Sequence, residues 1–354
     1  MNISEKLYHI YFEKNIPILA SIELTRRCVN SCIHCYLNET QEKLSKSDEE
    51  LSFSKIKDIF FQLKTLGTVF LNITGGEPLL RKDIVKIVKI AVEFNFLVKL
   101  FSSLNYESNI IESLYDVGLR YIDVSLYGRK DIHNLVTRSN SFDKTFENIK
   151  KAKELGFKIT IKTPVMSLNI NEIRWLKEFS SNYNLNFKID PIITPRNNGD
   201  TSPLKYSISK NDIEKLLEYG LINLENIDLD CNAEYVACGA MKSVIAIDAY
   251  GNVTPCISLP LCIGNVNENK ISDILKSNIA CDVRKKLEIE PKKCIKCNYK
   301  TICSRCPGVS WVYAGRVDYV YKQACEISKK IYEIRYSSYK KEQDEVAGIE
   351  TTLQ

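Results

Sequence analysis

The feature that most constrains the fold is a repeated alternation of short β-branched runs with longer amphipathic stretches, from about residue 18 to about residue 195. Between the runs, apolar residues recur at helical spacing, and Gly67, Gly118 and Gly156 stand where helices would be capped. The predicted strands are 18–24, 69–74, 97–103, 121–126, 158–165 and 187–193. Strands that alternate with helices predict a parallel sheet with right-handed crossovers. The sequence therefore predicts an α/β fold whose six units are too few for a closed eight-unit barrel.

Three cysteines, Cys28, Cys32 and Cys35, follow the first predicted strand at a three-then-two spacing. A four-iron cluster needs four ligands, so three thiolates leave one iron with an open position. An open position on a bound metal is where chemistry takes place. For so short a motif, a zinc knuckle or three unrelated buried thiols are the alternatives.

A second motif, Gly75-Gly76-Glu77-Pro78, follows the apolar run 68–73 and precedes a helical stretch that begins near Asp83. Two glycines let the backbone approach a ligand closely. Glu77 stands at the strand end and can accept a hydrogen bond from an ammonium group. Alone, this tetrapeptide would be an ordinary strand-to-helix turn. In barrels of alternating parallel strands and helices, the active-site residues lie at the carboxyl ends of the strands. The cysteine motif and the motif at 75–78 both follow predicted strands.

Together the two motifs resemble the radical S-adenosylmethionine (SAM) superfamily. The resemblance implies an open six-unit barrel in which the open iron takes the amino and carboxylate groups of SAM. An electron from the cluster would then cleave SAM to a 5′-deoxyadenosyl radical. The segment from Gly75 to Pro78 would hold the methionine amino group.

The same resemblance implies four further SAM contacts. Ser125 looks like the serine that contacts the ribose, and Ser103 lies where the family often has a Thr-Asn-Gly-like turn. Arg138 would pair with the SAM carboxylate, although Asn134 replaces the usual aspartate of that segment. His34 would pack against the adenine. A solvated surface arginine and a plain loop histidine are the competing interpretations.

The C-terminal third holds a second group of cysteines around a hairpin-like stretch at 244–253. They are Cys231, Cys238, Cys256, Cys294, Cys297, Cys303, Cys306 and Cys325. This pattern resembles the SPASM domain, and Gly251 precedes Cys256 by the four-residue gap of that family. The gap between Cys303 and Cys306 is two residues, where three is more usual.

The SPASM resemblance implies two auxiliary clusters and hence three 4Fe-4S clusters in all. Interleaved pairing would give the first cluster Cys231, Cys238, Cys256 and Cys306, and the second Cys294, Cys297, Cys303 and Cys325. A zinc ribbon made from the run 294–306 is the alternative. Cys262 and Cys281 are weak catalytic candidates, since most unassigned cysteines are small buried hydrophobes.

Composition agrees with an enzyme rather than a small zinc module. The 354 residues are 44% hydrophobic and carry a formal net charge of +5. Lysines and glutamates are interleaved along the chain, a pattern that does not indicate nucleic-acid binding. No signal peptide or membrane-spanning stretch is visible, so the thirteen cysteines indicate metal ligands in a reducing cytosol. The predicted organisation is an N-terminal segment (1–17), barrel (18–205), bridging segment (206–230), SPASM domain (231–330) and charged tail (331–354).

The two resemblances together imply a radical enzyme that modifies a ribosomally made peptide or protein by crosslinking, epimerisation or side-chain oxidation. The expected partners are that substrate and an electron donor such as flavodoxin or ferredoxin. Because only about 20 residues precede the first strand, leader recognition is expected from the barrel mouth, the C-terminal domain or a separate leader-binding protein. Maturation of a tetrapyrrole or another small cofactor is the alternative reaction. An iron-sulfur electron carrier or scaffold is the non-enzymatic alternative, although it would need no SAM pocket.

Overall fold

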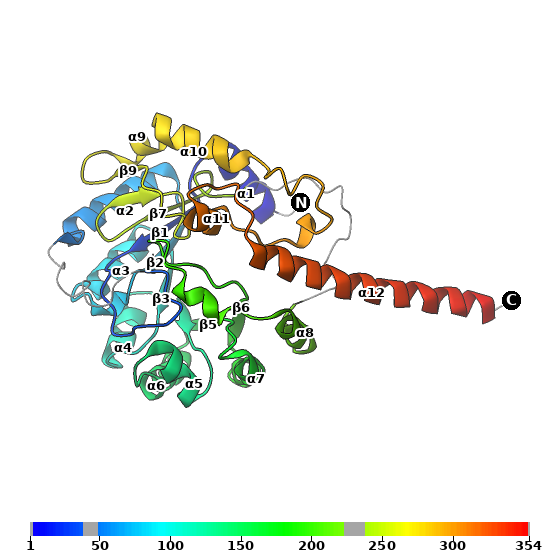
Figure 1. Ribbon diagram of the computed structural model, residues 1–354. Helices are drawn as coiled ribbons and strands as arrows, with labels where there is room; N and C mark the ends of the chain where they lie inside the picture. The colour runs from blue at the N-terminus through cyan, green and yellow to red at the C-terminus, as the bar shows by residue number, and fades with distance from the viewer. Residues whose placement is uncertain (1–2, 38–48, 223–237, 353–354) are drawn as a thin grey trace.

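The computed structural model describes residues 3–37, 49–222 and 238–352. A nine-stranded sheet with the order β6-β5-β4-β3-β2-β1-β7-β8-β9 forms its centre (Figure 1). The first six strands are parallel: β1 Leu19–Glu23, β2 Phe70–Thr74, β3 Leu97–Ser102, β4 Tyr121–Ser125, β5 Lys158–Pro164 and β6 Asn186–Asp190. All six predicted strands are confirmed. Only β6 ends clearly earlier than expected.

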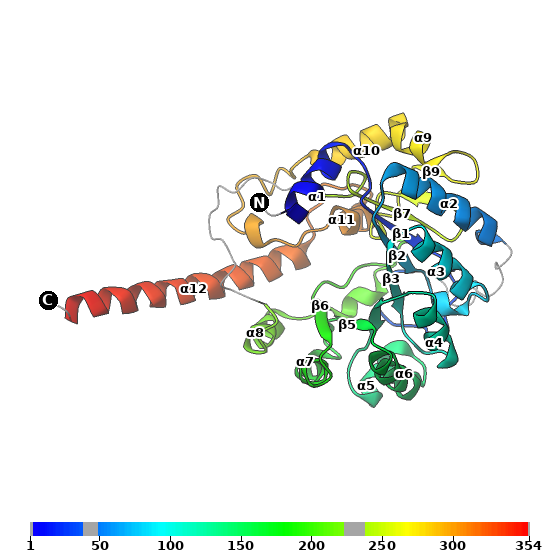
Figure 2. The same cartoon turned by 180° about the vertical axis from the view of Figure 1, so that it is seen from behind.

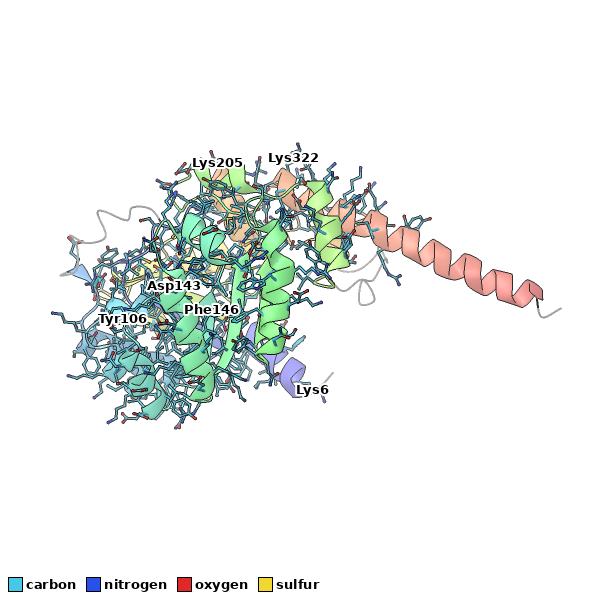
Figure 3. The ribbon with its side chains drawn as sticks, turned by 90° about the horizontal axis from the view of Figure 1, so that it is seen from below. Lys6, Tyr106, Asp143, Phe146, Lys205 and Lys322 are labelled. Atoms are coloured by element: carbon cyan, nitrogen blue, oxygen red, sulfur yellow. The ribbon has the colours of Figure 1, made fainter. Side chains whose placement is uncertain are left out.

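Helices cover the outer face of this sheet (Figure 2). They are α2 Phe53–Leu66, α3 Ile84–Glu93, α4 Asn109–Asp116, α5 Lys130–Thr137, α6 Phe142–Glu154 and α7 Ile173–Asn182. Ser52 caps the start of α2, and Gly67 ends it at a φ of 98°, a left-handed conformation that favours glycine. Phe146 of α6, labelled in Figure 3, packs on Phe179 of α7 with ring centroids 5.2 Å apart.

The two faces of the parallel sheet differ in polarity, because successive strand residues point to opposite sides. Ile73, Leu100 and Ile161 are fully buried in the apolar core. The alternate positions carry polar or charged residues, and Asp123 and Lys162 are examples. The concave face of the sheet therefore carries polar and charged side chains, whereas the outer face contributes apolar side chains to the core.

The cysteine-rich C-terminal part continues the barrel sheet. Strands β7 Val244–Ile247 and β8 Asn252–Thr254 form the predicted hairpin, and β9 Gly264–Asn265 extends it. Strand β7 pairs in parallel with β1, an attachment that the sequence did not predict. Three helices follow, α9 Ile271–Lys276, α10 Asn278–Glu288 and α11 Pro307–Ala314.

Each segment outside the two predicted domains contains a helix. Helix α1 Ile3–Glu13 lies in the N-terminal segment, and α8 Lys210–Glu218 in the bridging segment. Helix α12 runs from Lys322 to Thr352, takes in residues 331–352 of the charged tail and projects from the body (Figure 1). Among the helices of the described residues, none combines the length and apolarity that crossing a bilayer requires.

Candidate active site

A cavity of about 560 Å³ lies on the concave side, at the carboxyl ends of the parallel strands. Each of β1 to β6, or the loop that follows it, contributes to its wall. The wall includes the three cysteines of the first motif together with Gly75, Gly76 and Glu77. Residues from the C-terminal part complete it: Ile257, Ser258, Val309 and Val312. Both parts of the chain therefore shape one cavity.

Two other segments hold the loop that carries the three cysteines. Ser31 and Ile33 donate backbone hydrogen bonds of 3.0 Å to the carbonyls of Thr137 and Val136 at the end of α5. From the other side, Arg196 donates to the carbonyl of Cys35 at 3.0 Å. The loop is thus bonded between the β4–α6 region and the segment after β6, although it follows β1 in the chain.

The three thiols lie close enough to affect one another. Burial raises the pKa of Cys32, and the neighbouring Cys35 and Cys28 raise it further, while a hydrogen bond from Tyr127 acts in the opposite direction. All three are half-buried, and none forms a disulfide within the described residues. Such an environment destabilises three thiolates unless a cation binds them, which fits a site for an iron-sulfur cluster.

Gly75 and Gly76 are required by contacts with the base of the cysteine loop rather than by open space for a ligand. A Cβ atom on Gly76 would lie 2.1 Å from the carbonyl oxygen of Arg27, and one on Gly75 would lie 2.3 Å from that of Thr25. The backbone N–H of Gly76 donates to Thr25 at 2.7 Å, and that of Glu77 donates to Arg27 at 2.7 Å. The two motifs therefore form one backbone-bonded unit.

Glu77 is 1% exposed, and both of its carboxylate oxygens accept hydrogen bonds from protein groups. Oε1 accepts from the Ser102 hydroxyl at 2.7 Å and from the Leu79 N–H at 3.2 Å. Oε2 accepts from the N–H and hydroxyl of Ser103 at 2.8 and 2.6 Å. Burial raises the pKa of Glu77 despite these bonds. The carboxylate thus joins β2 to β3, and Ser103 lies in the cavity wall beside it.

His34 and Ser125 also lie in the cavity wall. The His34 ring meets Tyr127 edge-on at 4.9 Å, and its buried Nδ1 has no hydrogen-bond partner among the described residues. Burial, aided by the charge of Arg196, lowers the pKa of His34 to about 4, so the ring is neutral near pH 7. An unpaired nitrogen at this wall is a contact point for a bound polar molecule.

Two residues of the predicted SAM contacts do not line the cavity. Pro78 is the first residue of a short 3₁₀ turn at Pro78–Leu80 and is buried. Arg138 is exposed and caps α5 with a φ of 52°, a left-handed turn that redirects the chain after the helix. Arg138 is therefore a surface residue in the described structure.

The C-terminal cysteines fall into two electrostatic neighbourhoods. Burial and the nearby Cys306 and Cys238 raise the pKa of Cys256 to about 12. In the second neighbourhood, the pKa of Cys325 is raised by burial and by Cys303 and Cys297. Burial also raises the pKa of Cys294, and Cys303, Cys297 and Cys325 contribute. These groups coincide with the interleaved pairing, whose ligand assignments stay a prediction.

Three other cysteines belong to neither of these electrostatic groups as the structure describes them. Cys231 lies outside the described residues. Cys262 is exposed in a separate cavity of about 170 Å³, where its thiol donates to the carbonyl of Gly264 at 3.4 Å. Cys281 of α10 lies 3.8 Å from Arg284 Nη1 and lines neither cavity. Neither free thiol reaches the cavity of the first motif.

No three His, Cys, Asp or Glu side chains within the described ranges converge as the ligands of a single ion would. A cubane cluster binds each thiolate through a different iron, so its ligands need not converge on one point. No disulfide joins any of the twelve cysteines of the described residues. Soft thiolate ligands in groups of three and four are suited to iron-sulfur clusters.

The sequence missed several residues of the cavity wall. They are Tyr127, Lys162, Lys188, Asp190 and the four residues from the C-terminal part. A sequence signal was available for three of them. Ile257 and Ser258 directly follow Cys256, and Val309 lies three residues after Cys306, so each is close to a predicted cluster ligand. Lys162 and Lys188 lie near the carboxyl ends of two predicted strands.

Two family models match the chain. The model described as the radical SAM superfamily matches residues 22–179, and the SPASM model, described as an iron-sulfur cluster-binding domain, matches residues 238–307. The first range covers the strands that line the cavity up to β5, and the second covers β7 to the start of α11.

Known proteins align with nearly the whole chain. It is 25% identical over 343 residues to the AdoMet-dependent heme synthase of Methanosarcina barkeri, which covers 86% of this chain and 95% of that protein. The structure of Streptococcus suis SuiB bound to precursor peptide SuiA has a TM-score of 0.69 at 18% identity, covering 91% of this chain and 80% of that one. The structure of anSMEcpe with bound AdoMet and the Cp18Cys peptide has a TM-score of 0.68 at 15% identity, covering 93% and 99%. These structures share the fold.

Proposed function

Because the chain belongs to the radical SAM superfamily and carries a SPASM iron-sulfur cluster-binding domain, we propose that this enzyme modifies a ribosomally made peptide or protein. The observation that carries the proposal is the cavity shared by the barrel and the C-terminal part. Ile257, Val309 and Val312 add apolar groups to the wall of the cavity that the cysteine loop also lines, so a substrate held there would contact both parts of the chain. SuiB and anSMEcpe, which have this fold, have been seen with bound peptides.

The residues of the cavity have separate roles in this proposal. Cys28, Cys32 and Cys35 hold the cluster that binds SAM, and this cluster supplies the electron that cleaves SAM. His34 offers its unpaired Nδ1 to SAM, and Ser125 offers its hydroxyl. Glu77 positions Ser103 and the strand ends rather than serving only as a direct ammonium acceptor, because its oxygens already accept four hydrogen bonds.

The C-terminal cysteines hold two auxiliary 4Fe-4S clusters, which brings the total to three. Cys238, Cys256 and Cys306, with Cys231, would hold the first, and Cys294, Cys297, Cys303 and Cys325 the second. Their electrostatic grouping supports this division. An external donor such as flavodoxin or ferredoxin would reduce the enzyme, and a separate protein could present the leader of a precursor peptide.

Iron content and SAM cleavage test these assignments. Anaerobically reconstituted protein should bind about twelve irons, four for each cluster. Cys32→Ala should abolish reductive formation of 5′-deoxyadenosine, whereas Cys303→Ala should retain it and lose only auxiliary-cluster iron. In D₂O, where epimerisation also adds mass, peptides encoded beside the gene should acquire a mass change with the intact enzyme and not with Cys303→Ala. Undiminished SAM cleavage by Cys32→Ala would contradict the proposal.

Tetrapyrrole maturation is the second candidate, because the heme synthase of M. barkeri aligns over 95% of its own length. Incubation of the reduced enzyme with SAM and a porphyrin that carries carboxylate side chains separates the two. A SAM-dependent change in the porphyrin spectrum, with no mass change in any neighbouring peptide, would favour the second candidate.

A further inference from the structure

Two lysines face the cavity from adjacent strands. Lys162 of β5 is in register with Lys188 of β6 and with Ser125 of β4, so the three side chains share one face. All three line the cavity. Of the described residues in this wall, these two lysines are the only lysine or arginine side chains. Like charges on neighbouring strands destabilise a sheet unless a negative charge offsets them.

Asp123 of β4 offsets part of the positive charge of these lysines. It is 3% exposed, and its Oδ2 lies 3.1 Å from Lys162 Nζ. The same carboxylate lies 3.5 Å from Lys99 Nζ through Oδ1. Lys162 also lies over the Phe101 ring, 4.7 Å from its centroid. The single carboxylate of Asp123 is therefore shared by Lys99 and Lys162, and these three side chains together carry a net positive charge.

Lys188 has no hydrogen-bond or ion-pair partner among the described residues, and its side chain is exposed to the cavity. The nearest acid along its own strand is Asp190, on the same face two residues further on. Asp190 accepts a hydrogen bond of 2.9 Å from the Ile192 N–H. Burial raises its pKa, the Ile192 N–H and Lys162 oppose the shift, and no ion pair joins it to Lys188 in the described structure. The cation of Lys188 thus remains available to a ligand.

We propose that Lys188 and Lys162 bind a carboxylate of the substrate inside the barrel. The proposal rests on the proposed function and adds the substrate class, namely a molecule with a carboxylate near the group that is modified. In a peptide this is an Asp or Glu side chain or the C-terminus. Neighbouring strands lie about 4.8 Å apart, a spacing at which two ammonium groups can reach one carboxylate.

SAM also carries a carboxylate, and the assay must separate it from that of the substrate. The substitutions are Lys188→Gln and the double variant Lys162→Gln/Lys188→Gln, with Lys188→Arg as the conservative variant. Lys158→Gln is the matched control, because Lys158 lies on β5 with the same facing but outside the cavity wall. SAM affinity and substrate-free formation of 5′-deoxyadenosine are measured first. We expect both to stay within twofold of the unmodified enzyme in every variant.

Binding of two carboxylate probes is then measured by calorimetry on the SAM-loaded, reconstituted enzyme. One probe is a pentapeptide with a central Glu and a free C-terminus, compared with its Gln counterpart amidated at the C-terminus, and the other is coproporphyrin III, compared with its tetramethyl ester. The enzyme should prefer one acid over its neutral counterpart by about tenfold. The preference should vanish in the double variant and survive in Lys158→Gln and Lys188→Arg.

Each outcome decides a separate point. Equal affinity of the acids and their neutral counterparts would overturn the carboxylate site, as would a preference that the double variant retains. A tenfold loss of SAM affinity in Lys188→Gln would overturn it too, because the anion would then belong to SAM. A charge preference for the porphyrin alone would uphold the site and contradict the peptide proposal.

Discussion

Replacing Glu77 tests whether this buried carboxylate is chiefly a connector between β2 and β3. In Glu77→Ala, the Ser102 and Ser103 hydroxyls can rotate to other partners, but the backbone N–H groups of Leu79 and Ser103 lose their acceptor. Each buried, unsatisfied N–H costs about 1–3 kcal/mol. Loss of the carboxylate also relieves the burial cost that raises the pKa of Glu77. We therefore expect the free energy of unfolding to fall by about 2–4 kcal/mol.

Glu77→Gln separates the bonds from the charge. The amide oxygen can still accept from Ser103, while the amide NH₂ faces the Leu79 N–H and leaves it without an acceptor. One unsatisfied N–H predicts a loss of about 1–2 kcal/mol. Glu93→Ala is the matched control, because Glu93 is 60% exposed and pairs only with Lys89 in the described structure. Its effect should stay below about 0.5 kcal/mol.

The assay is denaturant unfolding of the reduced, metal-free protein, followed by circular dichroism, beside SAM affinity of the reconstituted enzyme. The order of stability should be unmodified protein, Glu77→Gln, then Glu77→Ala. If Glu77→Ala unfolds with the free energy of the unmodified protein and yet fails to bind SAM, the connector role is wrong. Glu77 would then act by direct contact with the SAM ammonium group.

Three further perturbations follow from particular contacts. Gly76→Ala should destabilise the protein by about 1–3 kcal/mol and reduce iron at the cysteine loop, because the new Cβ would lie 2.1 Å from the Arg27 carbonyl oxygen; normal iron content at the barrel cluster would contradict this. Gly308→Ala should reduce iron at the C-terminal cysteines alone, since its Cβ would lie 2.3 Å from the Ser258 carbonyl oxygen; unchanged iron at those cysteines would contradict this. Burial lowers the pKa of His133 to about 4, so the unfolded chain binds a proton that the folded protein does not as the pH falls from about 6.5 to about 4. Over this range His133 should remove up to about 3 kcal/mol of stability, and His133→Gln should show a correspondingly shallower loss in pH-dependent unfolding.

The sequence predicted the cysteine ligands of the site more fully than it predicted the other residues that line the cavity. Spacing in the chain is enough to recognise Cys28, Cys32 and Cys35, because a short loop keeps them together in any compact fold. Arg138 shows the limit of such reasoning. Its motif was recognisable, but the left-handed cap that ends α5 places it at the surface. Conversely, Lys188 belongs to no motif, and only the register of β6 against β5 brings it beside Lys162.

The sequence by itself determined the alternation of strands and helices, since side-chain periodicity and glycine caps are local properties that need no knowledge of the fold. It also determined the cysteine spacings. Only the tertiary structure decided that β7 pairs with β1, that Glu77 is saturated by serines from β3 and its following turn, and that the C-terminal part closes the cavity. These contacts join residues far apart in the chain, and their energy depends on strand order, register and close backbone approach. No local pattern encodes those three quantities, because each is settled only when the whole sheet assembles.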